Sequence, residues 1–226
     1  MSSWPDAVSF ARVWADAVDA HADGPFLIFE APDGTVTSWT YGEFDVIVSR
    51  LATELVSHGL GPGRSVHLAL TNSPTFVAAW LATIRLGGWI VPSDPMGRTP
   101  EFADHVDRTD PVVGFCAPGR ADTYLAAVGD RTVFRIDEAD ATFDWLPADR
   151  VTEWPETELH DRAAVMFTSG TTGRPKGVEI TQANYTFAGK ARAEAAALTA
   201  DDRQLVVLPL FHANAQYYSF CSAIWA

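Results

Sequence analysis

One short stretch of the sequence gathers residue types that suit the binding of phosphate groups. Within ten positions it contains three glycines, four hydroxyl side chains and one lysine: Thr168, Ser169, Gly170, Thr171, Thr172, Gly173, Lys176 and Gly177. Glycines let the backbone approach a ligand closely and turn its N–H groups toward an anion. The hydroxyls add neutral donors, and a lysine adds a mobile positive charge suited to phosphate. The stretch therefore predicts a loop that holds a polyphosphate.

The neighbouring residues place this loop between two strands. The apolar run 163–167 predicts a buried strand, with the loop at its carboxyl end, and residues 178–180 predict a short strand after it. The common nucleotidase loop differs, because it needs Gly-Lys followed by Ser or Thr at the start of a helix. Here Pro175 precedes the lysine and Gly177 follows it. A glycine-rich surface loop without a ligand is the alternative, but such loops rarely combine a lysine and four hydroxyls behind a buried strand.

The decapeptide 168–177 resembles the phosphate-binding motif of the adenylate-forming superfamily, which comprises acyl-CoA synthetases, peptide-synthetase adenylation domains and firefly luciferase. Three other stretches are similar to segments of the same family: 40–44, 85–95 and 208–212. The likeness extends over residues 26–226, which is nearly the whole chain.

The resemblance implies a reaction. A carboxylic acid attacks the α-phosphate of ATP, pyrophosphate leaves, and the acyl-AMP passes to a thiol, either of coenzyme A or of a carrier-protein pantetheine. The cofactors implied are ATP and Mg²⁺, with CoA as co-substrate. Residues 169–173 would bind the β- and γ-phosphates, and the Thr168 hydroxyl would approach the magnesium ion. Lys176 and His212 are the residues with implied catalytic roles, His212 as a gate between the acid and thiol channels or as a substrate-positioning group.

The wider pattern predicts an α/β fold. Strand and helix signals alternate from 65 to 136, which favours a largely parallel sheet flanked by helices. A helix over 8–20 and a hairpin of 26–29 with 36–39 precede this region. After the loop we expect a helix capped by Thr181, a buried strand over 204–208 and a helix from Tyr217. Residues 137–160 predict an irregular connector, and no internal domain boundary can be defended, so 1–226 is predicted to be one portion of the large adenylation domain.

Composition excludes several classes of partner. The chain has 226 residues, 47% of them apolar, and a net charge of −13, which argues against a nucleic-acid or anionic-membrane surface. The longest apolar run, 76–84, is shorter than the ~20 residues of a membrane span. No signal peptide is visible at the N-terminus. Cys116 and Cys221 predict buried small side chains rather than a disulfide or a metal site. A soluble cytoplasmic protein is therefore expected.

Other polar residues are candidates for structural roles or for contacts with the substrate. The other five histidines have no partner spacing and are expected to be structural or exposed: His21, His58, His67, His105 and His160. Asn214 and Gln216 are candidates for contact with an acyl pocket. Tryptophans such as Trp14, Trp39, Trp80 and Trp89 are predicted to face the core and to serve in packing.

The last expectation concerns length. The sequence ends within an apolar helical pattern, and members of the superfamily run to roughly twice this length, so an N-terminal portion of a larger synthetase is predicted. The C-terminal portion would supply an acidic magnesium partner, an aspartate for the ribose and a small mobile domain. We therefore expect the 226 residues alone to be inactive; a non-catalytic nucleotide-binding fragment and a genuine short protein are the alternatives. The acid substrate is not specified by these residues.

Overall fold

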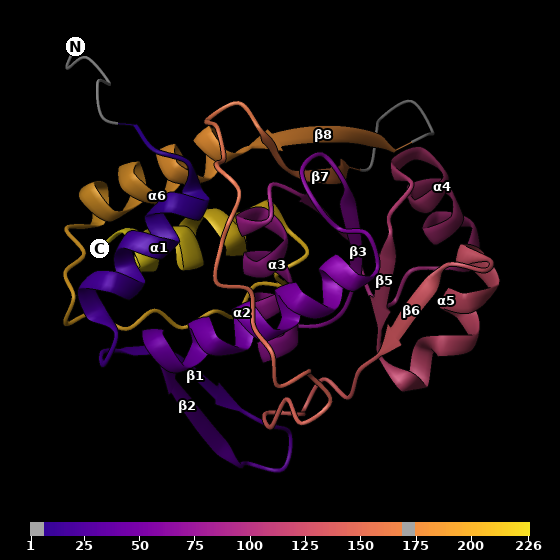
Figure 1. Ribbon diagram of the computed structural model, residues 1–226, viewed down its shortest axis with the longest axis horizontal. Coiled ribbons are helices and arrows are strands. Elements are labelled where there is room, and N and C mark those ends of the chain that lie inside the picture. The colour runs from indigo at the N-terminus through magenta and orange to yellow at the C-terminus, as the bar shows by residue number, and fades with distance from the viewer. Residues whose placement is uncertain (1–6, 169–174) are drawn as a thin grey trace.

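The computed structural model describes residues 7–168 and 175–226 and has three layers, with one sheet between two groups of helices (Figure 1). Its helices are α1 (Phe10–His21), α2 (Tyr41–Ser57), α3 (Pro74–Arg85), α4 (Thr99–Thr109), α5 (Ala121–Val128), α6 (Gln182–Ala196), α7 (Ala213–Ala215) and α8 (Ser222–Trp225). Its strands are β1 (Pro25–Glu30), β2 (Val36–Thr40), β3 (Ser65–Ala69), β4 (Trp89–Pro92), β5 (Val113–Cys116), β6 (Thr132–Arg135), β7 (Arg162–Thr168) and β8 (Lys176–Thr181). The predicted α/β class is confirmed.

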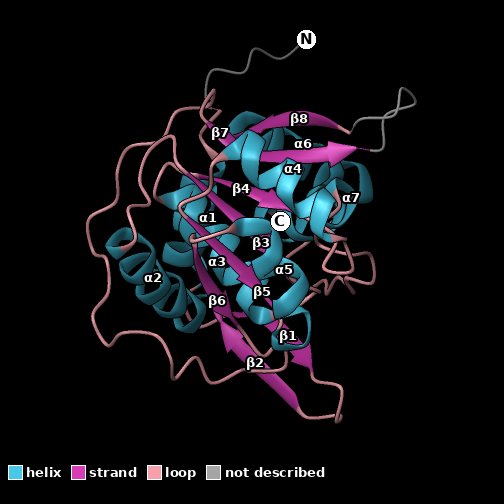
Figure 2. Ribbon diagram, turned by 90° about the vertical axis from the view of Figure 1, so that its right-hand side faces the viewer, coloured by secondary structure: helices cyan, strands magenta, loops and turns pink. Residues whose placement is uncertain are grey.

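The large sheet has six strands in the order β6-β5-β3-β4-β7-β8. Four of its pairings are parallel, and only the β7–β8 pairing at one edge is antiparallel. Every residue of β3, β4 and β5 is buried, as expected for parallel strands covered on both faces. The β1–β2 hairpin forms a separate two-stranded sheet that projects from one end of the molecule (Figure 2).

Local signals in the sequence set several helix ends. Thr40 and Glu43 form a reciprocal capping box at the start of α2, and Thr181 does the same with Asn184 at the start of α6. The Ser73 side chain accepts a hydrogen bond at the start of α3. Gly87, which follows α3, has φ +70°, a conformation that favours glycine and lets the chain turn into β4.

Hydrophobic cores lie on both faces of the sheet, and two of them are extensive. The larger core contains residues of α1, α2, α3 and α6, including the fully buried Trp14 and Trp80. The smaller core joins α4 and α5 to the sheet through residues such as Phe102, Val106 and Tyr124. Trp39 and Trp89 are also buried, and both cysteines are buried free thiols, as expected.

The segment between β6 and β7 has no helix or strand, which confirms the irregular connector. It is nevertheless attached, because Phe143 and Leu146 are buried in the larger core. The Arg50 guanidinium also donates to the carbonyls of Leu146 and Pro147 at 2.8 and 2.7 Å.

The prediction of a buried strand over 204–208 is wrong. These residues form neither a strand nor a helix, and Leu205 and Val207 have 86% and 75% of their surface exposed. Among the described residues no strand pairs with them, so their apolar side chains have no sheet face to pack on. The following helix begins at Ala213 rather than Tyr217, and its middle, Gln216–Cys221, is π-helical.

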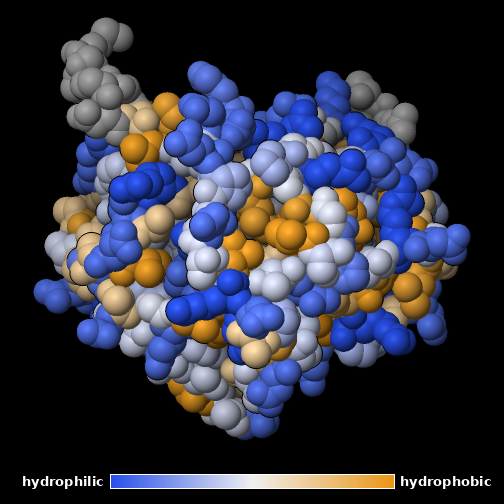
Figure 3. All heavy atoms as spheres, in the orientation of Figure 1, coloured by the Kyte–Doolittle hydropathy of each residue, from blue (hydrophilic) through white to orange (hydrophobic). Residues whose placement is uncertain are grey.

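The described helices include none with the length and hydrophobicity needed to cross a lipid bilayer. On the face shown in Figure 3, hydrophilic side chains surround a group of apolar residues near the middle. This polar surface agrees with the acidic composition of the chain.

Candidate functional site

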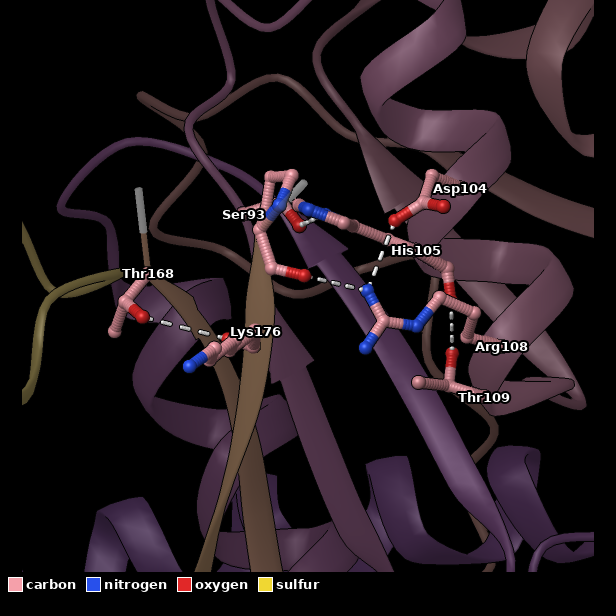
Figure 4. A network of polar contacts seen from close by, with 8 residues as sticks. Ser93, Asp104, His105, Arg108, Thr109, Thr168 and Lys176 are labelled. Atoms are coloured by element: carbon pink, nitrogen blue, oxygen red, sulfur yellow. Dashed lines mark hydrogen bonds and ion pairs between the residues drawn. The ribbon is translucent and has the colours of Figure 1, made fainter. Parts of the chain in front are cut away.

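The strands β7 and β8 bring the two described ends of the predicted phosphate loop together. Thr168 is the last residue of β7 and pairs with Lys176, the first residue of β8. The Thr168 hydroxyl donates to the main-chain carbonyl of Lys176 at 3.5 Å, and both side chains are exposed (Figure 4). The structure therefore places Thr168 and Lys176 opposite each other at the open end of the hairpin. The remaining predicted loop residues, Ser169, Gly170, Thr171, Thr172 and Gly173, lie outside the described residues.

A cavity of about 300 Å³ adjoins this end of the hairpin. Thr168 lines it together with His212, which comes from the segment before α7. Its remaining walls are Met166, Phe167, Val178, Ile180, Phe211, Ala213 and Asn214. The His212 ring is exposed and lies 4.4 Å from the Phe211 ring, centroid to centroid. Two site residues predicted from separate motifs thus share one cavity.

Asn72, just after β3, holds the chain that carries His212. Its amide donates to the carbonyl of Leu208 at 3.0 Å, and its carbonyl oxygen accepts from the Leu210 amide at 2.7 Å. Gln216 supports the same turn, since its Nε2 donates to the Leu210 carbonyl at 2.6 Å and its Oε1 accepts from the Tyr185 hydroxyl. Gln216 is fully buried, so of the two candidate acyl contacts only Asn214 faces the cavity.

Sequence reasoning missed an arginine that contacts β7 and the residue just before β8. Arg108 of α4 lies over the Phe167 ring, with its guanidinium carbon 4.6 Å from the ring centroid. Its Nη1 donates to the Pro175 carbonyl at 2.8 Å and pairs with the Asp104 carboxylate at 3.0 Å (Figure 4). The only local signal was the i,i+4 spacing of Asp104 and Arg108, which also occurs on ordinary helix surfaces.

A chain of buried polar groups lies behind Arg108, between α4, α5 and the sheet. His67 Nδ1 is 2.6 Å from the Tyr124 hydroxyl, and His67 Nε2 is 2.9 Å from Ser93 Oγ. Ser93 Oγ is 2.7 Å from His105 Nδ1, and the His105 ring stacks on Phe167 with centroids 3.9 Å apart. His67 and His105 are therefore structural, as expected, although His105 touches the residue that precedes Thr168.

Burial controls the ionisation of these hydrogen-bonded side chains. Desolvation lowers the pKa of His67 to about 3, with a smaller contribution from the nearby His105. Burial also lowers the pKa of His105 and raises the pKa of Tyr124. All three side chains are consequently neutral near pH 7, which avoids placing an unpaired charge between α4 and the sheet.

The described residues contain no cluster of three or more His, Cys, Asp or Glu side chains that could hold a metal ion. The exposed Thr168 hydroxyl is a hard oxygen of the kind that Mg²⁺ accepts as one ligand among phosphate oxygens and waters. The chemistry of Thr168 therefore fits a shared metal–phosphate site rather than a metal cage made by the protein.

Comparison with known protein families shows to which family the chain belongs. The model of the AMP-binding enzyme family matches residues 14–225. The chain belongs to the AMP-binding enzyme family. The resemblance to adenylate-forming enzymes deduced from residues 168–177 is thereby confirmed.

Two curated relatives are named as CoA ligases. A crotonobetaine/carnitine–CoA ligase of Salmonella arizonae is 32% identical over 232 residues, an alignment that covers 95% of this chain and 44% of the ligase. The corresponding enzyme of Salmonella paratyphi A is 29% identical, and its alignment covers 91% of this chain and 42% of the ligase. The chain thus spans less than half the length of the curated relatives it matches.

Two solved structures superpose on the fold. ATP-bound MatB from Rhodopseudomonas palustris matches with a TM-score of 0.82 and 25% identity, over 96% of this chain and 44% of that one. MenE from Bacillus subtilis, an O-succinylbenzoate CoA synthetase in complex with AMP, matches with a TM-score of 0.81 and 24% identity, over 94% of this chain and 53% of that one. The predicted fold of an N-terminal part of the adenylate-forming domain is confirmed.

Proposed function

We propose that this chain is the polyphosphate-binding part of an ATP-dependent acid–thiol ligase that makes acyl-AMP and passes the acyl group to coenzyme A. The observation that carries the proposal is the pairing of Thr168 with Lys176 at the open end of the β7–β8 hairpin, next to the cavity that His212 lines. Membership of the AMP-binding enzyme family supports the chemistry. The CoA ligases among the relatives support CoA over a carrier-protein thiol as acceptor.

In this proposal the hairpin end binds the β- and γ-phosphates of ATP. A carboxylate oxygen of the acid attacks the α-phosphorus, the bond to the bridging oxygen breaks, and pyrophosphate leaves with its negative charge. The Lys176 ammonium stabilises that charge electrostatically, which is the main demand of nucleotidyl transfer. Residues 169–173 contribute backbone N–H and hydroxyl donors to the same phosphates. The Thr168 hydroxyl would offer one ligand to Mg²⁺, which would neutralise further negative charge on the phosphates.

His212 acts later in the proposed sequence. From the wall of the cavity that Thr168 also lines, its exposed imidazole positions the acid and then the incoming thiol. The thiol sulfur attacks the acyl carbon of the acyl-AMP, and AMP leaves. Since ATP and CoA are intracellular metabolites, a cytoplasmic location forms part of the proposal.

The 226 residues span only 42–44% of the CoA ligases described above. We therefore propose that the chain by itself binds ATP but does not form acyl-AMP, because ribose and magnesium ligands are supplied elsewhere in the whole enzyme. Incubation with candidate acids, ATP and labelled pyrophosphate tests this. Acid-dependent incorporation of label into ATP would contradict the proposed inactivity while supporting the chemistry.

Calorimetric titration with ATP tests the assignment of the hairpin. The sequence contains two lysines, Lys176 and Lys190, so the variants Lys176→Ala and Lys190→Ala form a matched pair. Loss of a charge that contacts the phosphates costs ~2–4 kcal/mol, so Lys176→Ala should weaken ATP binding at least about thirtyfold. Lys190→Ala, on the α6 surface near Glu194, should bind ATP as the parent chain does. Equal effects of the two variants, or no binding of ATP by the parent chain, would contradict the proposal.

A further inference from the structure

Arg108 is the only described side chain outside β7 and β8 whose hydrogen bond reaches the main chain of residues 175–177. It links β7 to the residue that precedes β8, next to the proposed phosphate site. On β7 it covers the ring of Phe167, the residue before Thr168. Its Nη1 also donates to the carbonyl of Pro175, the residue before Lys176. One guanidinium thus contacts the hairpin on both sides of its open end, without itself being part of either strand.

The position of the guanidinium is determined by several neighbours. Asp104, one turn earlier on α4, pairs with Nη1 at 3.0 Å, and the two side chains are 23% and 32% exposed. Gly177 lies beside both groups: a Cβ there would be 3.4 Å from the Phe167 ring and 3.7 Å from Arg108 Nη2, and its tightest neighbour would be Val165 Cγ1 at 3.0 Å. His105, one residue after Asp104, stacks almost parallel to the same ring, at an angle of 10°. Two residues of α4, His105 and Arg108, therefore hold the end of β7 through contacts with the Phe167 ring.

An arginine suits this place better than a lysine. The guanidinium is planar, with several N–H donors in fixed directions, so it can lie over a ring while it donates to a carbonyl and a carboxylate. A lysine ammonium is a point charge and cannot satisfy the three partners with the same geometry. Cation–aromatic contacts of this kind gain strength when they are partly shielded from water.

The helix that carries Arg108 is itself anchored to the sheet. The pKa of Tyr124 is raised by burial, so its hydroxyl keeps its proton, and His67 is its only hydrogen-bond partner among the described residues. Tyr124 therefore donates to His67 Nδ1, His67 Nε2–H donates to Ser93, and the Ser93 hydroxyl donates to His105 Nδ1. This one-way chain ties α5, β3 and the end of β4 to α4, one turn of helix from Arg108. Movement of α4 relative to β3 and the end of β4 would break it.

We propose that Arg108 is a positioning residue of the phosphate site: by holding Phe167 and Pro175 it fixes the separation and orientation of Thr168 and Lys176 so that both address one polyphosphate. The inference rests on the proposed function for its ligand, but its structural part concerns contacts that exist without ligand. Arg108 acts through the hairpin and does not itself contact the phosphates.

The test compares Arg108→Met and Arg108→Lys in the 226-residue chain. Arg12→Ala is the control, because Arg12 makes a comparable i,i+4 ion pair with Asp16 on α1. Each variant is titrated with ATP and with inorganic tripolyphosphate at a temperature where thermal melts show it to be folded. In parallel, the ¹H–¹⁵N spectrum without ligand reports the amides of Thr168, Lys176 and Gly177. Tripolyphosphate isolates binding of the phosphates from binding of the nucleoside.

Positioning predicts that Arg108→Met and Arg108→Lys both weaken ATP and tripolyphosphate at least about tenfold, and by a similar factor for the two ligands. The three hairpin amides shift in both variants, and Arg12→Ala changes neither readout. If Arg108→Lys binds as the parent does while Arg108→Met does not, Arg108 supplies only charge and the proposal is overturned. Unchanged affinity in both variants also overturns it.

Failure of the proposed function would look different. If the parent chain binds neither ATP nor tripolyphosphate, the hairpin is not a phosphate site, and the positioning of Thr168 and Lys176 for a polyphosphate falls with it. If the parent binds both ligands and Lys176→Ala does not, the proposed function stands, and the Arg108 variants alone decide the positioning.

Discussion

Two apolar runs of the sequence look alike, but one is buried in the fold and the other is exposed. Residues 163–167 and 204–208 both predict a buried strand. The first run lies in β7, where Ala163 and Ala164 are completely buried between β4 and β8. In the second run the side chains of Leu205, Val207 and Leu208 are mostly exposed. Conversely, a polar residue can be buried: His67 of β3 is completely buried in the sheet.

Whether a run is buried in this fold therefore depends on whether a partner strand is present, rather than on the polarity of its residues. β7 is paired on both sides. Its Ala163, Ala164 and Met166 pack in the larger core, while Val165 and Phe167 pack in a small separate cluster with Trp89 and Val91. Residues 204–208 have the Asn72 side chain in place of a neighbouring strand. A buried histidine is tolerated because both of its ring nitrogens have hydrogen-bond partners.

The largest effect should come from placing a charge in each run. Ala164→Asp buries an unpaired carboxylate and should destabilise the fold by at least about 4 kcal/mol, or prevent folding. Val207→Asp replaces a side chain that is 75% exposed and should change stability by less than about 0.5 kcal/mol. Urea unfolding measures both. A comparable loss in the two variants would mean that 204–208 is also packed in solution.

The strand and helix pattern could be predicted where local signals agree with tertiary partners. The caps at Thr40, Ser73 and Thr181 and the alternation from 65 to 136 depend on residues close in sequence. The meeting of Thr168 with Lys176 also follows from a short hairpin. By contrast, Arg108 reaches Pro175 across 67 positions, and no local pattern encodes such a contact. The exposure of 204–208 depends on which strands are available, which is equally a tertiary property.

An effect of intermediate size is expected in the pH dependence of stability, because His67 is buried as a neutral ring. The folded chain keeps His67 neutral down to a pKa of about 3, whereas an unfolded chain protonates it near 6.5. The unfolded state therefore binds more protons in this window, and stability falls as pH drops from 6.5 toward 3. The contribution is up to about 1.4 kcal/mol per pH unit.

Denaturant unfolding at pH 7, 5.5 and 4.5 measures this slope. His67→Gln should lose stability less steeply toward acid than the parent, while His160→Gln, which changes an exposed side chain, should follow the parent. Parallel pH profiles for His67→Gln and the parent would show that His67 is not buried as a neutral ring.

The smallest effect concerns the attachment of the exposed run. Asn72→Ala removes the acceptor of the Leu210 amide and the donor to the Leu208 carbonyl. We expect a loss of about 1 kcal/mol in stability and faster hydrogen exchange of the Leu210 amide. Asn214→Ala, at an exposed position, is the control. Unchanged exchange at Leu210 would show that other contacts hold this segment.

The central claim is that the open end of β7–β8 binds the phosphates of ATP. Its most direct test is titration of the ¹⁵N-labelled chain with ATP, with the backbone amide shifts of the hairpin end and of residues 204–208 as the readout. The account predicts saturable shifts at Thr168, Lys176 and Gly177 and none at Leu205 or Val207. Shifts that bypass the hairpin, or no saturable shift at all, would contradict it.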